Sequence, residues 1–288
     1  MKIHYQTQTR LTFGKLLALA ATCLAFQTAQ ATLLFSEGFG YTSGNNLGSG
    51  LVNPGSTVAW GAGNAGNLQI GGGNLTFAGL NDLGGNDLTV TPGASTTDFN
   101  TFSPVTSGSI YVSFLVQCTA LPTGNNPLLA LNPSPAVPAG GADALTVYTG
   151  AITGGWKIGV RSAGGGSGAV YTSTALALNT TYFVVEQFTF GSSGNLFVSS
   201  LTGAPVPGAS QPGTPTATQV NGTTVVTSIN DVGIKAQTAV AQGNFIIDNI
   251  LVGTTWEDVT PVAAPEPATL ALVGLGLAGL VLVRRARR

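Results

Sequence analysis

The chain has 288 residues, 41 of them glycine, with only 7% charged residues and a formal net charge of −1. Seven of its ten basic residues lie close to the two ends, so only Lys157, Arg161 and Lys235 fall within segment 32–264, which also holds ten acids and carries a charge of −7. So few cations exclude a nucleic-acid-binding surface, which must neutralise phosphates. The scarcity of Glu and Lys likewise excludes a coiled coil.

Residues 1–31 are predicted to be an export signal. A basic stretch and the apolar run 16–26 precede Ala29 and Ala31, the small residues that a signal peptidase accepts, so Thr32 is the expected new N-terminus. The alternative is a short transmembrane anchor, but this apolar run has eleven residues, and a span needs about 20. We therefore expect the Sec translocon and signal peptidase to act on this end.

Segment 32–262 is predicted to be one all-β domain. It lacks helical periodicity, and its apolar residues alternate with polar ones, as in strands that bury one face. The clearest predicted strands are 109–118, 156–161, 182–190, 195–201 and 245–252, and weaker candidates are 67–70, 74–77, 87–90 and 225–234.

The turns between these strands favour an antiparallel jelly-roll β-sandwich. Residues 191–194 read Gly-Ser-Ser-Gly between two strands, which is typical of a hairpin. Segments 122–143 and 203–224 are rich in Pro and Gly and are expected to be surface loops.

Removal of the signal would decide which chemistry remains. His4 is the only histidine, and Cys23 also lies in the signal, so the mature body would hold one cysteine, Cys118, and no histidine. This excludes Ser-His-Asp and Cys-His catalysis and every His-ligated metal site. Cys118 is expected to be a small buried hydrophobe, and no cofactor is expected.

Glu186 is the most unusual residue of the predicted strands. It shares a strand face with Tyr182, Val184 and Phe188. A carboxylate on an apolar concave sheet could hold sugar hydroxyls or act as an acid, but a glycosidase needs two carboxylates. The alternatives are an ion pair with Arg161 or Lys157, or exposure on an outer face.

Trp60 and Trp156 are the other speculative glycan contacts, because aromatic rings stack on sugars. The competing interpretation is that they belong to the core, as most aromatic residues of a sandwich do.

The almost repeated Asn-Asp-Leu-Gly-Gly-Asn-Asp-Leu places Asp82 and Asp87 five residues apart. Calcium prefers such oxygen ligands. The alternative is that Asx turns around a glycine hairpin explain the pattern without a bound metal. Asp248 and Asn249 lie in a predicted strand and are expected to be a satisfied polar pair.

The last residues have three parts in order. Pro265, Glu266 and Pro267 precede an uncharged apolar stretch, predicted as a transmembrane helix over about 267–284, and the chain closes on an Arg-rich tail made of Arg284, Arg285, Arg287 and Arg288. The sixteen apolar residues would reach roughly 24 Å as a helix, against about 30 Å of hydrocarbon. Snorkelling arginine side chains can cover the difference, and they should stay cytoplasmic.

This tripartite tail, residues 263–288, resembles the PEP-CTERM sorting signal of Gram-negative bacteria. The resemblance implies that an exosortase, a membrane enzyme, recognises the tail and releases the body to the cell surface or the extracellular polysaccharide matrix of a biofilm. A plain C-terminal membrane anchor is the alternative.

The body has a second resemblance. The phrases LLFSEGFGYTSGNNLG, SGSIYVSFLVQ, TTYFVVEQFTF and FIIDNILVGTTWEDVTP are similar to those of LamG-like, concanavalin-A-like jelly rolls. The resemblance implies the fold, while function varies widely within that fold class.

Three functions are compatible with these features. The first is a non-enzymatic cell-surface or matrix protein, which export, sorting and the missing catalytic residues favour. The second is a lectin-like module that binds exopolysaccharide. The third is a glycan-active enzyme that uses carboxylates alone, which would need two acids roughly 5–9.5 Å apart.

Overall fold

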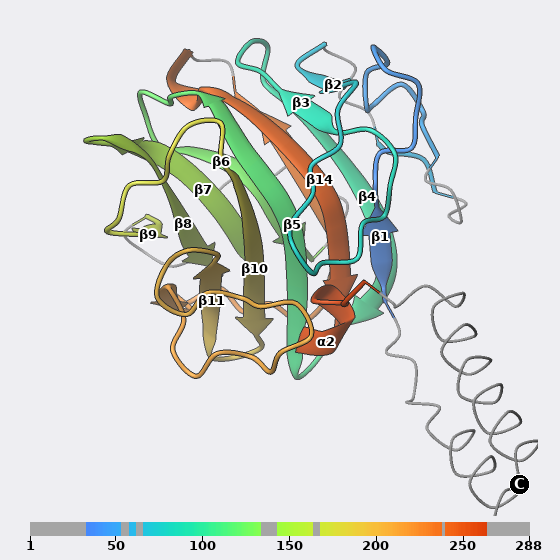
Figure 1. The fold of residues 1–288 in the computed structure, drawn as a ribbon. Coiled ribbons are helices and arrows are strands. Elements are labelled where there is room, and N and C mark those ends of the chain that lie inside the picture. Colours follow the sequence, from blue (N-terminus) through green and yellow to red (C-terminus); the bar gives the residue numbers. More distant parts are fainter. Residues whose placement is uncertain are drawn as a thin grey trace, which may run out of the picture. The chain divides into compact units, whose positions relative to one another are not determined.

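The computed structural model of the chain describes residues 33–52, 58–61, 66–133, 143–163, 168–237 and 240–263. The predicted export signal, the Pro-Glu-Pro motif and the predicted membrane helix lie outside these residues. Within the described part, no helix is long and apolar enough to cross a membrane. The described residues form two antiparallel sheets (Figure 1), which confirms the predicted all-β class.

The first sheet has eight strands, and β1 and β14 bring the two ends of the described chain together within it. Its spatial order is β12 (Ala217–Val220), β11 (Ser193–Val198), β10 (Thr181–Thr189), β5 (Ser109–Ala120), β14 (Asn244–Gly253), β3 (Leu88–Val90) and β2 (Leu68–Ile70), and β1 (Phe35–Glu37) pairs with β14.

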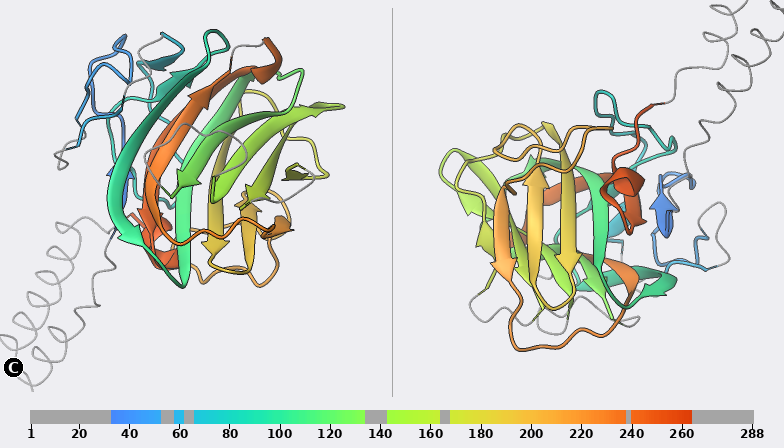
Figure 2. Two further views of the ribbon diagram at one scale, coloured as in Figure 1. Left: turned by 180° about the vertical axis from the view of Figure 1, so that it is seen from behind. Right: turned by 90° about the horizontal axis from the view of Figure 1, so that it is seen from below.

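The second sheet has six strands, which the view from behind in Figure 2 shows side by side. Its order is β4 (Thr96–Val105), β13 (Ile229–Ala236), β6 (Asn126–Asn132), β7 (Leu145–Ile152), β8 (Gly155–Ser162) and β9 (Val170–Tyr171). Two short helices, η1 (Val240–Gln242) and α2 (Trp256–Val259), flank β14 along the chain.

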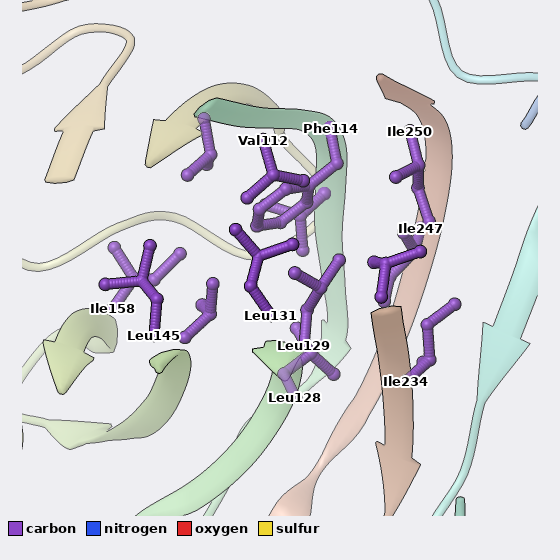
Figure 3. Close-up of a cluster of buried hydrophobic side chains, with 14 of the residues drawn as sticks. Val112, Phe114, Leu128, Leu129, Leu131, Leu145, Ile158, Ile234, Ile247 and Ile250 are labelled. Atoms are coloured by element: carbon purple, nitrogen blue, oxygen red, sulfur yellow. The ribbon is translucent and has the colours of Figure 1, made fainter. Parts of the chain in front are cut away.

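The inner faces of both sheets share one apolar core, so the two sheets pack as a β-sandwich. Alternate residues of each strand enter this core, and Figure 3 shows Val112 and Phe114 of β5 near Leu129 and Leu131 of β6. Cys118 is fully buried here as a free thiol, which confirms the expected small hydrophobe. Each buried Leu or Val contributes roughly 1.5–3 kcal/mol relative to an exposed one, so this layer contributes much of the stability of the fold.

The outer face of the eight-stranded sheet is also apolar and is covered. We call this covered surface the sealed face; its buried residues are Leu75, Leu80, Tyr111, Leu115, Phe183, Val185, Phe197, Leu251, Trp256 and Val259. Helix α2 and the segments 74–83 and 201–216 lie over it (Figure 2, right). Thr255 and Asp258 form a capping box at the start of α2, which satisfies backbone donors that a four-residue helix leaves unpaired.

The structure confirms the strongly alternating strands and corrects several weaker predictions. Segment 74–77 is not a strand, because Asp248 rather than a neighbouring strand accepts the backbone N–H of Leu75, at 2.8 Å. Strand β6 lies inside the expected loop 122–143. Its Pro127 falls where the register with β7 shifts, the position at which a missing N–H is tolerated.

Strands β1, β4, β7, β9 and β12 also lie outside the predicted strands, and β12 falls inside the expected loop 203–224. Strand β4 is long, but within the described segments it lies at the edge of its sheet beside β13 and carries polar residues, so its sequence reads like a loop.

Candidate functional site

The three speculative glycan contacts all lie in the core, which corrects that prediction. Trp60 is 2% exposed, and Trp156 and Glu186 are fully buried. Trp156 packs edge-on against Tyr182 and Phe245, with ring centroids 5.9 and 5.4 Å away. Large rings fill the space between two sheets, so the interpretation as core residues is the correct one for both tryptophans.

Glu186 lies on the inner face of β10, as its place in the strand alternation predicts. Its register neighbours on the adjoining strands are Val112 and Leu196. Among the described residues, neither carboxylate oxygen has a hydrogen-bond partner, so the expected ion pair with Arg161 or Lys157 is absent. Burial raises the pKa of Glu186 well above its ordinary value, because the charged form is desolvated.

Trp60 has a structural role beside Glu37 of β1. The Oε2 atom of Glu37 accepts hydrogen bonds from Trp60 Nε1 at 2.8 Å and from the Tyr41 hydroxyl at 2.7 Å, and its Oε1 accepts from the backbone of Phe39 at 2.6 Å. This carboxylate therefore fixes the N-terminal segment onto the sandwich. Burial still raises its pKa, although these hydrogen bonds oppose the shift.

A small open cavity of about 220 Å³ adjoins Glu37. The other lining residues, several of them glycine, are Ser36, Gly38, Gly40, Leu83, Gly84 and Gly85. Because three donors already satisfy Glu37, the cavity offers a ligand little beyond backbone groups.

Asp248 and Asn249 are a satisfied polar pair, as predicted. Asp248 accepts from the backbone of Leu75 and of Asn249, and Asn249 Oδ1 accepts from the backbone of Leu83 at 3.0 Å. Asn249 has a φ of 50°, a left-handed conformation that asparagine tolerates better than most residues. The pair holds segment 74–83 against β14, and burial raises the pKa of Asp248 to about 7.

The possible calcium ligands Asp82 and Asp87 lie in different environments. Asp82 is exposed and accepts from the backbone of Gly84 and the side chain of Asn74, both at 2.8 Å, which is the Asx-turn arrangement. Asp87 is buried against Gly71. Within the described segments, no group of three or more His, Cys, Asp or Glu side chains could hold a metal ion.

The outer face of the six-stranded sheet carries basic side chains. Trp156, Ile158 and Val160 of β8 enter the core, so Lys157 and Arg161 project from the outer face. The same parity places Lys235 of β13 there, because Ile234 and Ala236 are inward. Tyr148 of β7 and Tyr171 of β9 pair with Gly159 and share this side. We call the surface formed by Tyr148, Lys157, Arg161, Tyr171 and Lys235 the basic face.

Side chains on the basic face contact one another but leave it partly exposed. The Lys157 ammonium lies 4.3 Å from the centroid of the Tyr171 ring, and the Arg161 guanidinium donates to the Tyr148 hydroxyl at 3.4 Å. All five residues are half-buried. Gly159 leaves room for Tyr171, since an added Cβ would come within 2.6 Å of its ring. Burial raises the pKa of Tyr171 to about 12, so its hydroxyl stays protonated.

Two carboxyl groups lie deeper on the same side of this sheet. Asp231 accepts a hydrogen bond from Asn132 at 2.7 Å, and Asp143 accepts one from Thr146 at 3.0 Å. Burial raises the pKa of Asp231 to about 7, the Asn132 hydrogen bond lowers it, and the charge of Asp143 raises it further. Burial lowers the pKa of Lys235, and the charge of Asp143 opposes that shift, so this buried acid lies near a cation of the basic face.

Sequence reasoning missed the basic face, although one signal was present. The polar positions of the 156–161 alternation are where Lys157 and Arg161 stand, so their outward direction was readable. That Lys235 lies on the same face of this sheet was not readable, because β8 reaches β13 only through β7 and β6.

Comparisons with solved structures give distant similarities. The globular domain of T. cruzi calreticulin is 15% identical, over 80% of this chain and 90% of that chain, with a TM-score of 0.47. An endo-β-1,4-glucuronan lyase from the fungus Trichoderma reesei is 13% identical, over 81% and 100%, with a TM-score of 0.43. A structure concerning endo-acting O-glycanases of the human gut microbiota is 12% identical, over 78% of this chain and 100% of that chain, with a TM-score of 0.44. Similarities this low carry no functional argument.

The C-terminus has a more specific match. No curated protein matches the sequence, but residues 263–288 match the family described as the PEP-CTERM protein-sorting motif. The match covers the end of the chain and leaves the body unassigned. It implies export and sorting at the membrane, with an exosortase as the processing partner. The chain therefore carries a PEP-CTERM sorting motif at its C-terminus.

Proposed function

We propose that the protein is a non-enzymatic component of the cell surface or extracellular matrix. The observation that carries this proposal is the sorting motif at residues 263–288. In this reading, residues 1–31 direct export and are removed. The apolar span 267–284 then holds the chain in the inner membrane until an exosortase processes it near Pro265, Glu266 and Pro267. The body that reaches the surface is a LamG-like β-sandwich.

We further propose that the body binds exopolysaccharide through the basic face. Tyr148 and Tyr171 support this, because tyrosine combines a flat apolar ring with a hydroxyl and so suits the apolar and polar sides of a sugar. The sealed face cannot serve, since α2 and two segments cover it. A polysaccharide array probed with the full chain tests the proposal, and a blank array with folded protein would contradict it.

Localisation tests the sorting step separately. The protein, tagged within an exposed loop, should leave the membrane fraction in cells that contain the exosortase. Replacement of Pro265, Glu266 and Pro267 by alanine should retain it there. Equal release of both forms would contradict the sorting proposal and would leave polysaccharide binding untouched.

A carboxylate-based, glycan-active enzyme remains the second candidate, which the proximity of Asp231 to Asp143 favours. Asp231 has a pKa of about 7, which suits a proton-transferring group near neutral pH. Both side chains are buried, at 0% and 7% exposure, so no substrate reaches them in this conformation. Product release from polysaccharides that disappears in Asp231→Asn would support this candidate, and its absence would favour the non-enzymatic one.

A further inference from the structure

The charged residues are segregated on the surface of the sandwich. Of the ten acids in segment 32–264, only Asp82 and Glu257 are exposed. Both belong to elements that cover the sealed face: Asp82 lies beside Leu80 and Leu83, and Glu257 is in α2. The remaining eight acids are buried: Glu37, Asp87, Asp98, Asp143, Glu186, Asp231, Asp248 and Asp258.

All three cations of the same segment, by contrast, lie on the basic face. Lys157, Arg161 and Lys235 are partly exposed there. The formal charge of −7 therefore does not describe what a partner meets. A ligand that approaches the six-stranded sheet meets positive side chains, and one that approaches the sealed face meets the exposed acids.

The spacing of the cations indicates the size of the ligand. Lys157 and Arg161 are four residues apart in β8, which separates their Cα atoms by roughly 13 Å. Strand β13 is three strands away from β8, which places Lys235 about 14 Å across the sheet. One small anion cannot bridge such distances, whereas a polymer with repeated negative groups can contact several cations together.

We propose that the basic face binds a polysaccharide whose sugars carry carboxylates, a uronate polymer. This inference rests on the exopolysaccharide binding proposed above and specifies its ligand class. The guanidinium of Arg161 can hold a carboxylate through two parallel hydrogen bonds, and Lys157 contacts a second carboxylate as a point charge. Tyr171 and Tyr148 lie beside these cations and contact the sugar rings, which free phosphate or a simple polyanion would lack.

Binding of the full chain, purified in a non-ionic detergent, to three immobilised polymers tests this inference. The polymers are polygalacturonate, its carboxyl-reduced neutral form and inorganic polyphosphate. We expect the protein to bind polygalacturonate at least tenfold more tightly than the reduced form, and we expect this binding to weaken as the salt concentration is raised. Arg161→Gln and Lys157→Gln should each weaken the binding of polygalacturonate at least threefold.

Val206→Glu is the matched control, because it also changes the net charge by −1. Val206 is 55% exposed in segment 201–216, over the sealed face. It should leave binding unchanged, and thermal unfolding of each variant shows whether it is folded.

Three results would overturn the inference. Equal binding of the carboxyl-reduced polymer, unaffected by Arg161→Gln, would leave polysaccharide binding intact but refute the uronate class. Equal binding of polyphosphate would show charge attraction without sugar recognition. No binding of either polysaccharide, together with a blank array, would refute the proposed function as well.

Discussion

The two outer faces of the sandwich differ in how far other segments of the chain cover them. The sealed face buries aromatic side chains beneath α2, and hydrogen bonds such as Trp256 Nε1 to the carbonyl of Ala209, at 2.9 Å, fasten its cover. The basic face bears no comparable apolar cluster among the described residues and presents Lys157, Arg161 and half-buried tyrosines. The sealed face contributes stability through its buried apolar contacts, whereas the five side chains of the basic face stay partly exposed. The comparison therefore separates the residues that hold the fold from those that could serve function.

The largest effect should come from the sealed face. Trp256 is 3% exposed, and its ring meets Phe197 and Tyr111 edge-on at 5.1 and 6.3 Å. Trp256→Ala should lower the free energy of unfolding by about 3–5 kcal/mol, because it leaves a cavity. Urea unfolding measures this change, with the exposed Val206→Ala as control. A loss below about 1 kcal/mol would mean that the cover of this face is dispensable.

The core between the faces should respond to pH through Glu186. Burial raises its pKa in the folded state, so its favourable contribution is complete below the unfolded value, near 4.5, and is lost as pH rises toward the folded pKa. Glu186→Gln removes the ionisation. The variant should therefore lack the loss of stability that the natural protein shows between pH 5 and pH 8, because no carboxyl proton has to be retained in the folded state.

Urea unfolding at pH 5 and at pH 8 tests this prediction, with Glu257→Gln, at an exposed position, as control. If the free energy of unfolding of Glu186→Gln changes between pH 5 and pH 8 as much as that of the natural protein, another group causes the pH dependence.

A smaller effect is expected at the start of α2. The Thr255 hydroxyl accepts the backbone N–H of Asp258 at 3.2 Å, so Thr255→Ala should cost about 1 kcal/mol. Thr255→Ser keeps the acceptor and should preserve most of the stability. If both variants lose the same amount, the methyl group rather than the cap is responsible. Thermal unfolding distinguishes the two.

The basic face should show the smallest change in stability. Arg161→Gln and Lys157→Gln should each alter the free energy of unfolding by only about 0.5 kcal/mol, as for most surface substitutions. A loss comparable to that of Trp256→Ala would mean that these cations hold the fold, and the contrast between the two faces would disappear. Chemical unfolding of the purified variants measures it.

The sequence predicted the architecture best where alternation was strongest. Segments 109–118, 182–190 and 245–252 became the adjoining strands β5, β10 and β14, because their side chains divide between two buried layers. It failed at β6, whose Pro127 and flanking asparagines are typical of a loop. Tertiary pairing with β13 and β7 overrides that local preference.

The candidate site was less predictable than the fold. Periodicity placed Glu186 on the correct face of its strand but could not reveal that this face is the closed interior. Trp60 illustrates the same limit, because its hydrogen bond to Glu37 joins residues 23 positions apart. Which side chains gather on a sheet depends on strand order, and strand order is set by contacts distant in sequence.

The burial of acids has a consequence for how unfolding is measured. Five of them have pKa values that burial raises in the folded state: Glu37, Asp87, Glu186, Asp231 and Asp248. The folded protein therefore binds protons near pH 6 that the unfolded chain releases. Unfolding in a lightly buffered solution should acidify it, and the calorimetric enthalpy should vary with the heat of ionisation of the buffer.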